Sequence, residues 1–373
     1  MNKMKYFAIG SFNFGVKKEP PFKFTGSEYL SELEKQLSNI ENLSQLSIET
    51  DEKFPNYSEQ ITKRTVNIQN GIGSFPNTLI LDISFNLHIP FEKQAKLKDV
   101  KKKRLRTYTE DFSIKISSSF IPVAIIESLN PKKNTDPSSA VQIVREYLKN
   151  EFKKSQYDYI RFEFLGPSPF HLDCYLIPKK GDGKDWFFET NEFIQKGYNK
   201  LAIYYNEQEF LNIDEAMDFL SKSIIDEFGF YYAYQQEKVS KINEWQKIQN
   251  KLNRLLKIEK TKGIVGIYKK FFQRQGLIGK LFIALITFEG ENIFNNNFYK
   301  NNYNQTFLID EGVYFKKFID KEIEEIQDYP IKQTTELINF LESRRVKSVE
   351  LTMAIIAAII GGAIGSLITI YIQ

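Results

Sequence analysis

The chain has 373 residues, which is long enough for two domains and a membrane element. Its 51 basic and 47 acidic residues leave a formal net charge of +4, so the overall charge singles out no class of partner. One cysteine and two histidines exclude a disulfide framework and a zinc site built from several such ligands, and the low cysteine content favours a reducing compartment.

The first part of the chain is predicted to contain several strands and one helix. Residues 5–15 predict a strand, and residues 25–40 begin with a capping box and continue with leucines at helical spacing. Residues 43–75 are polar and rich in Asn and Ser, with only short strand-like pieces. Residues 78–90 and 112–126 alternate apolar and polar side chains, which predicts two more strands.

A strongly basic segment connects these last two strands. Its eight basic residues, with Asp99 as the only acid, are Lys93, Lys96, Lys98, Lys101, Lys102, Lys103, Arg104 and Arg106. Lysine and arginine at this density neutralise phosphates, and Tyr108 is close enough to stack on a base, so the segment is the candidate site for a nucleotide or oligonucleotide. Anionic lipid head groups or another protein could be bound by the same charges, and a solvated surface loop is the third interpretation.

The middle of the chain continues the mixture of helices and strands. Residues 137–154 predict a helix, residues 159–165 and 170–177 predict two strands joined by a turn, and residues 200–205 predict another strand. This order indicates an α+β domain over residues 1–212, which we interpret as a cytosolic ligand-binding domain.

The strand over residues 170–177 carries a small group of reactive side chains. His171 and Asp173 would share one face of the strand while Cys174 points away, which is a poor geometry for a nucleophilic Cys–His pair. Phosphate-binding loops, serine nucleophile elbows and zinc-protease motifs are absent from the sequence. We therefore predict no catalytic residue, no cofactor and no metal site; a membrane-tethered enzyme with an unrecognised site is an alternative.

The segment 213–345 is predicted to be a helical coupling region. Residues 276–288 are interpreted as a core helix, with an interfacial segment as the alternative, and the Asn-rich residues 292–304 as a loop. Other stretches with apolar side chains at helical spacing are residues 214–228, 234–257 and 313–326, with Gly229 as a candidate kink.

The end of the chain has the composition of a membrane span. Residues 351–372 are 22 residues without a charge, and a helix of that length is about 33 Å long, close to the thickness of a bilayer's hydrocarbon core. We therefore predict a single C-terminal transmembrane helix over residues 346–373, with a buried core helix as the alternative. The basic flank of Arg344, Arg345 and Lys347 places the preceding domain in the cytoplasm. The bias toward Lys, Asn, Ile and Phe is typical of an AT-rich bacterial genome, so the predicted location is the inner membrane of a bacterium.

Small residues recur along this predicted span and would let neighbouring helices approach closely. They are Ala354, Ala357, Ala358, Gly361, Gly362, Gly365 and Ser366. The pattern predicts a homo-oligomer. In such a ring the carboxylate of Glu350, at the inner edge of the span, would favour cations.

A sensor domain, a helical region and a small-residue span in this order resemble the membrane-channel effectors of bacterial antiphage defence, Hailong-type systems among them. The likeness is one of architecture, and no residue role is carried over. It implies a homo-oligomeric ion channel or pore gated by a cytosolic nucleotide or oligonucleotide. A tail-anchored scaffold or binding protein without a pore is the alternative that uses the same architecture.

Overall fold

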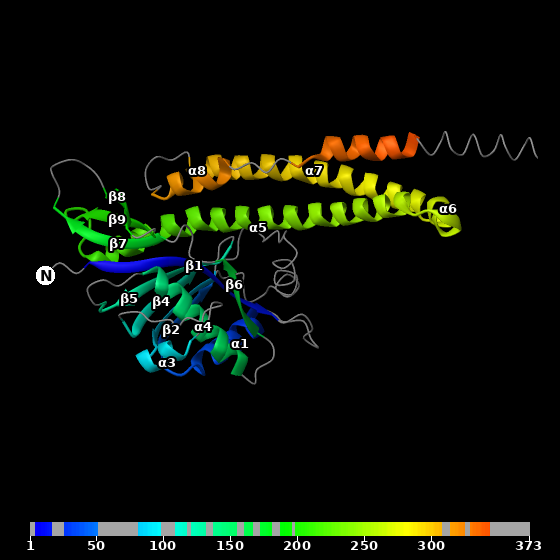
Figure 1. The fold of residues 1–373 in the computed structure, drawn as a ribbon. Coiled ribbons are helices and arrows are strands. Elements are labelled where there is room, and N and C mark those ends of the chain that lie inside the picture. Colours follow the sequence, from blue (N-terminus) through cyan, green and yellow to red (C-terminus); the bar gives the residue numbers. More distant parts are fainter. Residues whose placement is uncertain are drawn as a thin grey trace, which may run out of the picture. The chain divides into compact units, whose positions relative to one another are not determined.

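The computed structural model describes residues 4–16, 26–50, 81–97, 109–117, 121–131, 137–154, 160–166, 172–180, 187–195, 198–307, 314–324 and 329–343. The chain divides into two compact units. The first, called the α+β unit below, comprises Met1–Ser240 and Tyr299–Glu325, and the second, called the helical unit, comprises Lys241–Phe298 and Ile326–Gln373. The long helices α5 (Ile213–Lys260) and α7 (Arg274–Phe307) contribute residues to both units (Figure 1).

A nine-stranded sheet is the framework of the α+β unit. Its order is β2-β3-β4-β5-β1-β7-β9-β8, with β6 paired to β1, and every pair is antiparallel except β7 with β9. The strands are β1 (Lys5–Val16), β2 (Leu43–Thr50), β3 (Leu81–His88), β4 (Asp111–Ser117), β5 (Val123–Leu129), β6 (Ile160–Gly166), β7 (Leu172–Lys179), β8 (Phe188–Gln195) and β9 (Tyr198–Asn206).

Strand β1 lies at the centre of this sheet. Its first half pairs with β5 and β7, and its second half pairs with β6 after a register shift between Ser11 and Phe12. Because side chains alternate along a strand, Phe7 and Ile9 enter one hydrophobic core while Ala8 and Phe12 enter the other. The sheet therefore has a core on each face.

Helices cover both faces of the sheet (Figure 1). Helices α1 (Gly26–Ser38) and α4 (Ser138–Lys154) supply apolar side chains to one core, and the short helix α3 (Phe91–Lys96) follows β3. The first part of α5, the end of α7 and α8 (Lys316–Glu324) supply the other core.

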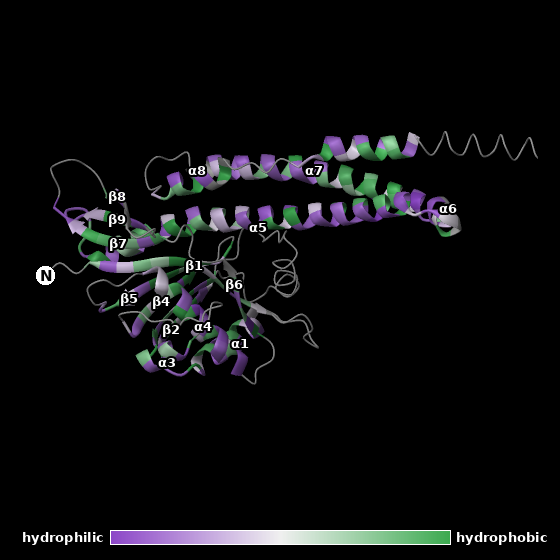
Figure 2. Ribbon diagram, viewed as in Figure 1, coloured by the Kyte–Doolittle hydropathy of each residue, from purple (hydrophilic) through white to green (hydrophobic). Residues whose placement is uncertain are grey.

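In the described residues of the helical unit, three helices are accompanied by a short connecting helix. The second part of α5 and the first part of α7 are joined through α6 (Gly263–Phe272), and residues 331–343 form a further helix. Ile248, Leu285 and Ile338, one from each of the three longer helices, share a single hydrophobic core. The part of α7 that follows α6 carries many hydrophobic residues (Figure 2).

The structure confirms several predicted elements and corrects two of them. The strand over residues 5–15 and the helix over 137–154 are confirmed, but the strand over 112–126 is divided into β4 and β5. The prediction of a loop over residues 292–304 is wrong, because α7 continues through these residues. The phenol rings of Tyr299 and Tyr303 lie 6.1 and 5.9 Å from the ring of Phe230, so tertiary packing outweighs the low helix propensity of the asparagines.

The predicted fold class also requires a correction. Its α+β part and its helical part agree with the described residues, but none of the helices in those residues is long and apolar enough to cross a membrane. In α7, for example, Lys280 and Glu289 interrupt the apolar residues. The transmembrane helix is therefore unsupported, and residues 346–373, for which it was predicted, lie outside the described ranges.

Candidate functional site

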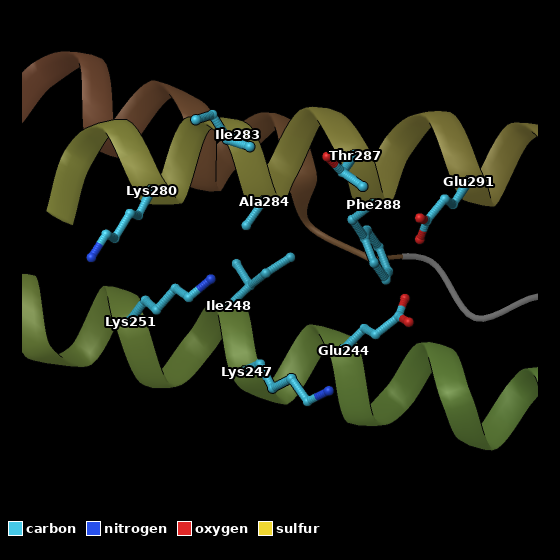
Figure 3. Close-up of a pocket in the computed structure, with 10 residues that line it drawn as sticks. All are labelled: Glu244, Lys247, Ile248, Lys251, Lys280, Ile283, Ala284, Thr287, Phe288 and Glu291. Carbon is cyan, nitrogen blue, oxygen red and sulfur yellow. The ribbon is translucent and has the colours of Figure 1, made fainter. Parts of the chain in front are cut away.

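A groove of about 420 Å³ lies between α5 and α7 in the helical unit. Its lining residues come from both helices and are labelled in Figure 3: Glu244, Lys247, Ile248 and Lys251 from α5, and Lys280, Ile283, Ala284, Thr287, Phe288 and Glu291 from α7. Apolar side chains form its floor, and charged side chains lie at both ends.

The spacing of apolar residues explains why the groove forms where it does. On α7, large apolar residues recur three or four residues apart at Leu281, Leu285 and Phe288. Together with Ile248 on α5 they pack into the core of the helical unit. Ala284 lies among these larger residues and fills less space than a leucine or isoleucine would. A hollow is therefore left above the buried side chains of Ile248 and Phe288.

The charges at the two ends of the groove are opposite in sign. Lys251 and Lys280 lie at one end, and Glu244 and Glu291 lie at the other, with Lys247 between Lys251 and Glu244 on α5 (Figure 3). Partial burial and the negative charge of Glu291 raise the pKa of the Glu244 carboxyl, although Lys247 and Lys241 act in the other direction. The carboxylates of Glu244 and Glu291 thus repel each other, and a cation bound at this end of the groove would reduce that repulsion.

Exposed apolar residues continue from the groove along α7. Ile283 and Ile286 are each 68% exposed, and Ile293 is 58% exposed. Together with Gly279 and Gly290 they recur every three or four residues, and a Cβ atom at either glycine would meet no other atom within 4 Å. Helix α7 is therefore apolar on two sides, one buried in the core and one facing water.

Such a surface has the properties of a protein-binding site. Isoleucines at this spacing are typical of a helix that packs against another helix, and the glycines permit a close approach. Separated charges at the ends of the groove would fix the orientation of whatever binds there.

The predicted basic segment is only partly described. Lys93 and Lys96 lie on α3; the Lys93 ammonium is 2.5 Å from a carboxylate oxygen of Glu41 and 5.9 Å from the ring centre of Tyr147. Lys93 lowers the pKa of the Glu41 carboxyl, so its charge already has a partner, whereas Lys96 is exposed. The other members, Lys98, Lys101, Lys102, Lys103, Arg104 and Arg106, lie outside the described residues.

The remaining candidate residues fall into two groups. The predicted packing and pore residues Glu350, Ala354, Ala357, Ala358, Gly361, Gly362, Gly365 and Ser366 all lie outside the described residues, as does His171. Asp173 is buried and accepts a hydrogen bond of 2.7 Å from the backbone N–H of Ser138 at the start of α4. Burial raises the pKa of the Cys174 thiol well above its ordinary value, which opposes formation of a thiolate.

The structure also contains a buried carboxylate that sequence analysis missed. Glu227 on α5 is 1% exposed and accepts hydrogen bonds from the backbone N–H groups of Tyr314 (2.9 Å) and Phe315 (2.7 Å) and from the Ser223 hydroxyl (2.9 Å). Burial raises its pKa to about 7 against these hydrogen bonds. Its position three residues after Ile224, on the apolar side of the helix, is the sequence signal that could have found it.

Comparison of the chain with protein-family models, with curated proteins and with solved structures found no match. Within the described ranges, no group of three or more His, Cys, Asp or Glu side chains is placed to hold a metal ion.

Proposed function

We propose that the chain is a homo-oligomeric effector, in which the groove of the helical unit joins two copies and the α+β unit binds a nucleotide or oligonucleotide. The observation that carries the proposal is the charge pattern of the groove, because that pattern is complementary to itself. Opposite charges lie at its two ends, on both of the helices that form it, and Lys247 lies between them on α5.

A two-fold axis across the groove makes use of this pattern. On α7, Lys280 and Glu291 are 11 residues apart (291 − 280), or about 16 Å along a helix. On α5, Lys251 and Glu244 are seven residues apart (251 − 244), which places them on the same side of the helix two turns from each other. In an antiparallel pair of grooves, each lysine end therefore meets the glutamate end of the other copy, as a closed dimer requires.

The apolar side chains supply most of the binding free energy in this arrangement. Full burial of one isoleucine stabilises a complex by about 1.5–3 kcal/mol, whereas an exposed ion pair contributes about 0–1 kcal/mol. Ile283 and Ile286 face water in the single chain and would lose that exposure in the pair. The charges then select the antiparallel orientation over the parallel one, which would bring like charges together.

Exchange of the charges tests the proposed pair. Lys280→Glu alone and Glu291→Lys alone should each weaken self-association by about 2 kcal/mol, or roughly 30-fold, because two like-charge contacts replace two ion pairs. An equimolar mixture of the two variants should associate as the unchanged protein does, since each copy then carries the charge that the other requires. Sedimentation velocity of the full chain measures both effects.

Lys300→Glu is the matched control, because Lys300 is an exposed residue of α7 outside the groove. Its self-association should be unchanged. If the two single variants associate normally, or if mixing them restores nothing, the groove is not the contact between copies.

The ligand part of the proposal depends on the basic segment. Replacing Lys101, Lys102, Lys103 and Arg104 with Glu should abolish binding of single-stranded oligonucleotides and should lower the 260/280 nm absorbance ratio of the purified protein if nucleic acid co-purifies. Each phosphate contact contributes about −0.7 to the slope of log affinity against log salt, so the slope should flatten by about 3. Reversal of Lys149, Lys153 and Lys154 on α4 is the control; unchanged binding by the first variant would remove this ligand site.

A scaffold that assembles through the same groove and binds no nucleotide is the alternative, and the oligonucleotide experiment distinguishes it from the effector. Ion conduction by the assembly and a role in antiviral defence stay predictions from the architectural resemblance.

A further inference from the structure

Helix α6 presents a narrow apolar stripe to water. Val265, Tyr268 and Phe272 are 60%, 58% and 67% exposed, and their spacing of three and four residues places them on one side of the helix. The rings of Tyr268 and Phe272 lie 4.9 Å apart. Three large apolar side chains are thus exposed together on a helix of ten residues, at the end of the hairpin formed by α5 and α7 (Figure 1).

Every charged side chain in the segment that carries this stripe is positive. From Lys260 to Phe288 the sequence contains no Asp or Glu. Lys260 and Lys262 are exposed, and Lys269 and Lys270 are half-buried. Glu259 precedes this stretch, but its carboxylate lies 2.6 Å from the Arg274 guanidinium and so has a cation of its own. The end of the hairpin is therefore an apolar stripe among lysines that form no ion pair with any carboxylate in the described part of the chain.

The backbone holds α6 in place before anything binds. Gly263 has a φ of +76°, which favours glycine, and a Cβ on Gly266 would lie 2.3 Å from the carbonyl oxygen of Thr261. At the other end of α6, the buried Arg274 donates a hydrogen bond to the carbonyl oxygen of Leu341. The stripe is thus preformed, so that binding needs little further ordering of the backbone.

We propose that α6 docks on the surface of an anionic lipid bilayer. Val265, Tyr268 and Phe272 would enter the boundary between head groups and acyl chains, where aromatic side chains are favoured, and Lys262 and Lys269 would reach the lipid phosphates. Charge complementarity selects this partner, since a uniformly positive apolar stripe matches a negative interface. A helix of ten residues is about 15 Å long, which is only about half of what is needed to cross the roughly 30 Å hydrocarbon core of a bilayer. In the proposed docking, α6 therefore lies along the interface.

A dye at position 265 tests this docking in the full chain. Val265→Cys can be labelled selectively, because the native Cys174 is buried and its thiol pKa is raised. With vesicles containing phosphatidylglycerol, emission of an attached nitrobenzoxadiazole dye should shift to shorter wavelength and be quenched by spin-labelled lipid; pure phosphatidylcholine vesicles should cause neither change. The same dye on Gln246→Cys should not respond, since that exposed position is 14 residues (260 − 246) or about 21 Å before Lys260 on α5.

Neutralising the lysines tests the electrostatic part. Replacement of Lys262, Lys269 and Lys270 with Gln should lower the affinity for anionic vesicles about 100-fold, which is roughly fivefold for each charge. The response of the dye at position 265 measures this affinity. The same replacements at Lys149, Lys153 and Lys154 on α4 should leave it unchanged. A dye that stays in water with anionic vesicles, or that responds equally to neutral ones, would overturn the docking.

Docking of α6 on lipid does not depend on the groove. In the Lys280→Glu variant, the dye at position 265 should still respond to anionic vesicles. Failure of the groove contact and failure of lipid docking are therefore separate results.

Discussion

Replacement of Glu227 with Ala is expected to lower the free energy of unfolding of the α+β unit by about 3 kcal/mol. The variant would leave the backbone N–H groups of Tyr314 and Phe315 without their acceptor, and an unsatisfied buried donor costs about 1–3 kcal/mol. Both residues directly precede α8, so the hydrogen-exchange rate should increase more in α8 than in the sheet. Urea unfolding followed by circular dichroism measures the stability.

The same carboxyl predicts a dependence on pH. Its pKa is about 7 in the folded chain, above its ordinary value of 4.5, so the folded state binds the proton more tightly than the unfolded state does. The contribution of this tighter proton binding to the free energy of unfolding is therefore fully present below about pH 4.5 and is lost as the pH rises through about 7. The difference between wild type and Glu227→Ala should be about 2 kcal/mol larger at pH 5.5 than at pH 7.5.

Glu209→Ala, at an exposed position, is the control for both measurements. It should change neither the stability nor its dependence on pH. If Glu227→Ala unfolds like the wild type at both pH values, the carboxylate does not hold the start of α8.

Replacement of Arg274 with Ala is expected to destabilise the helical unit by about 3 kcal/mol. Arg274 is 5% exposed, and its guanidinium pairs with Glu259 and donates to the carbonyl oxygen of Leu341, so it connects α5, α7 and the helix over residues 331–343. Removing one member of a buried pair leaves a charge and a carbonyl without partners. Hydrogen exchange measured by mass spectrometry should show faster exchange over residues 331–343.

The stability of Arg274→Lys should lie between that of the wild type and that of Arg274→Ala. An ammonium can keep the charge pair with Glu259 but lacks the planar fork that reaches two acceptors. Arg254→Ala, at an exposed position of α5, should be neutral. Equal protection of residues 331–343 in Arg274→Ala and wild type would show that the bridge contributes little.

Local pattern alone was sufficient for much of the secondary structure and insufficient for some of it. Alternation predicted β1 and β3, and helical spacing predicted α1 and α4, because each of these elements buries one side. Strand β2 was missed because it has the half-exposed, polar composition of a sheet edge. The continuation of α7 through its asparagines was missed for a different reason, since its stabilising contacts come from residues distant in the sequence.

The candidate sites show the same limit. The basic segment was visible in the sequence because its members lie close together along the chain. The groove, by contrast, brings Lys251 near Lys280 and Glu244 near Glu291 from two different helices. The sequence named the apolar residues 276–288 but could not say that α7 is apolar on two sides. Only packing against α5 shows which side is already occupied.

By itself, the sequence determined the α+β order of the first part, the helical character of the second and the positions of its charges, because these depend on neighbours along the chain. The tertiary structure alone decided that β1 would be central in the sheet, that Glu227 would be buried against Tyr314 and Phe315, and that α6 would present its aromatic residues to water. Burial depends on which distant segments meet, and no local pattern contains that information.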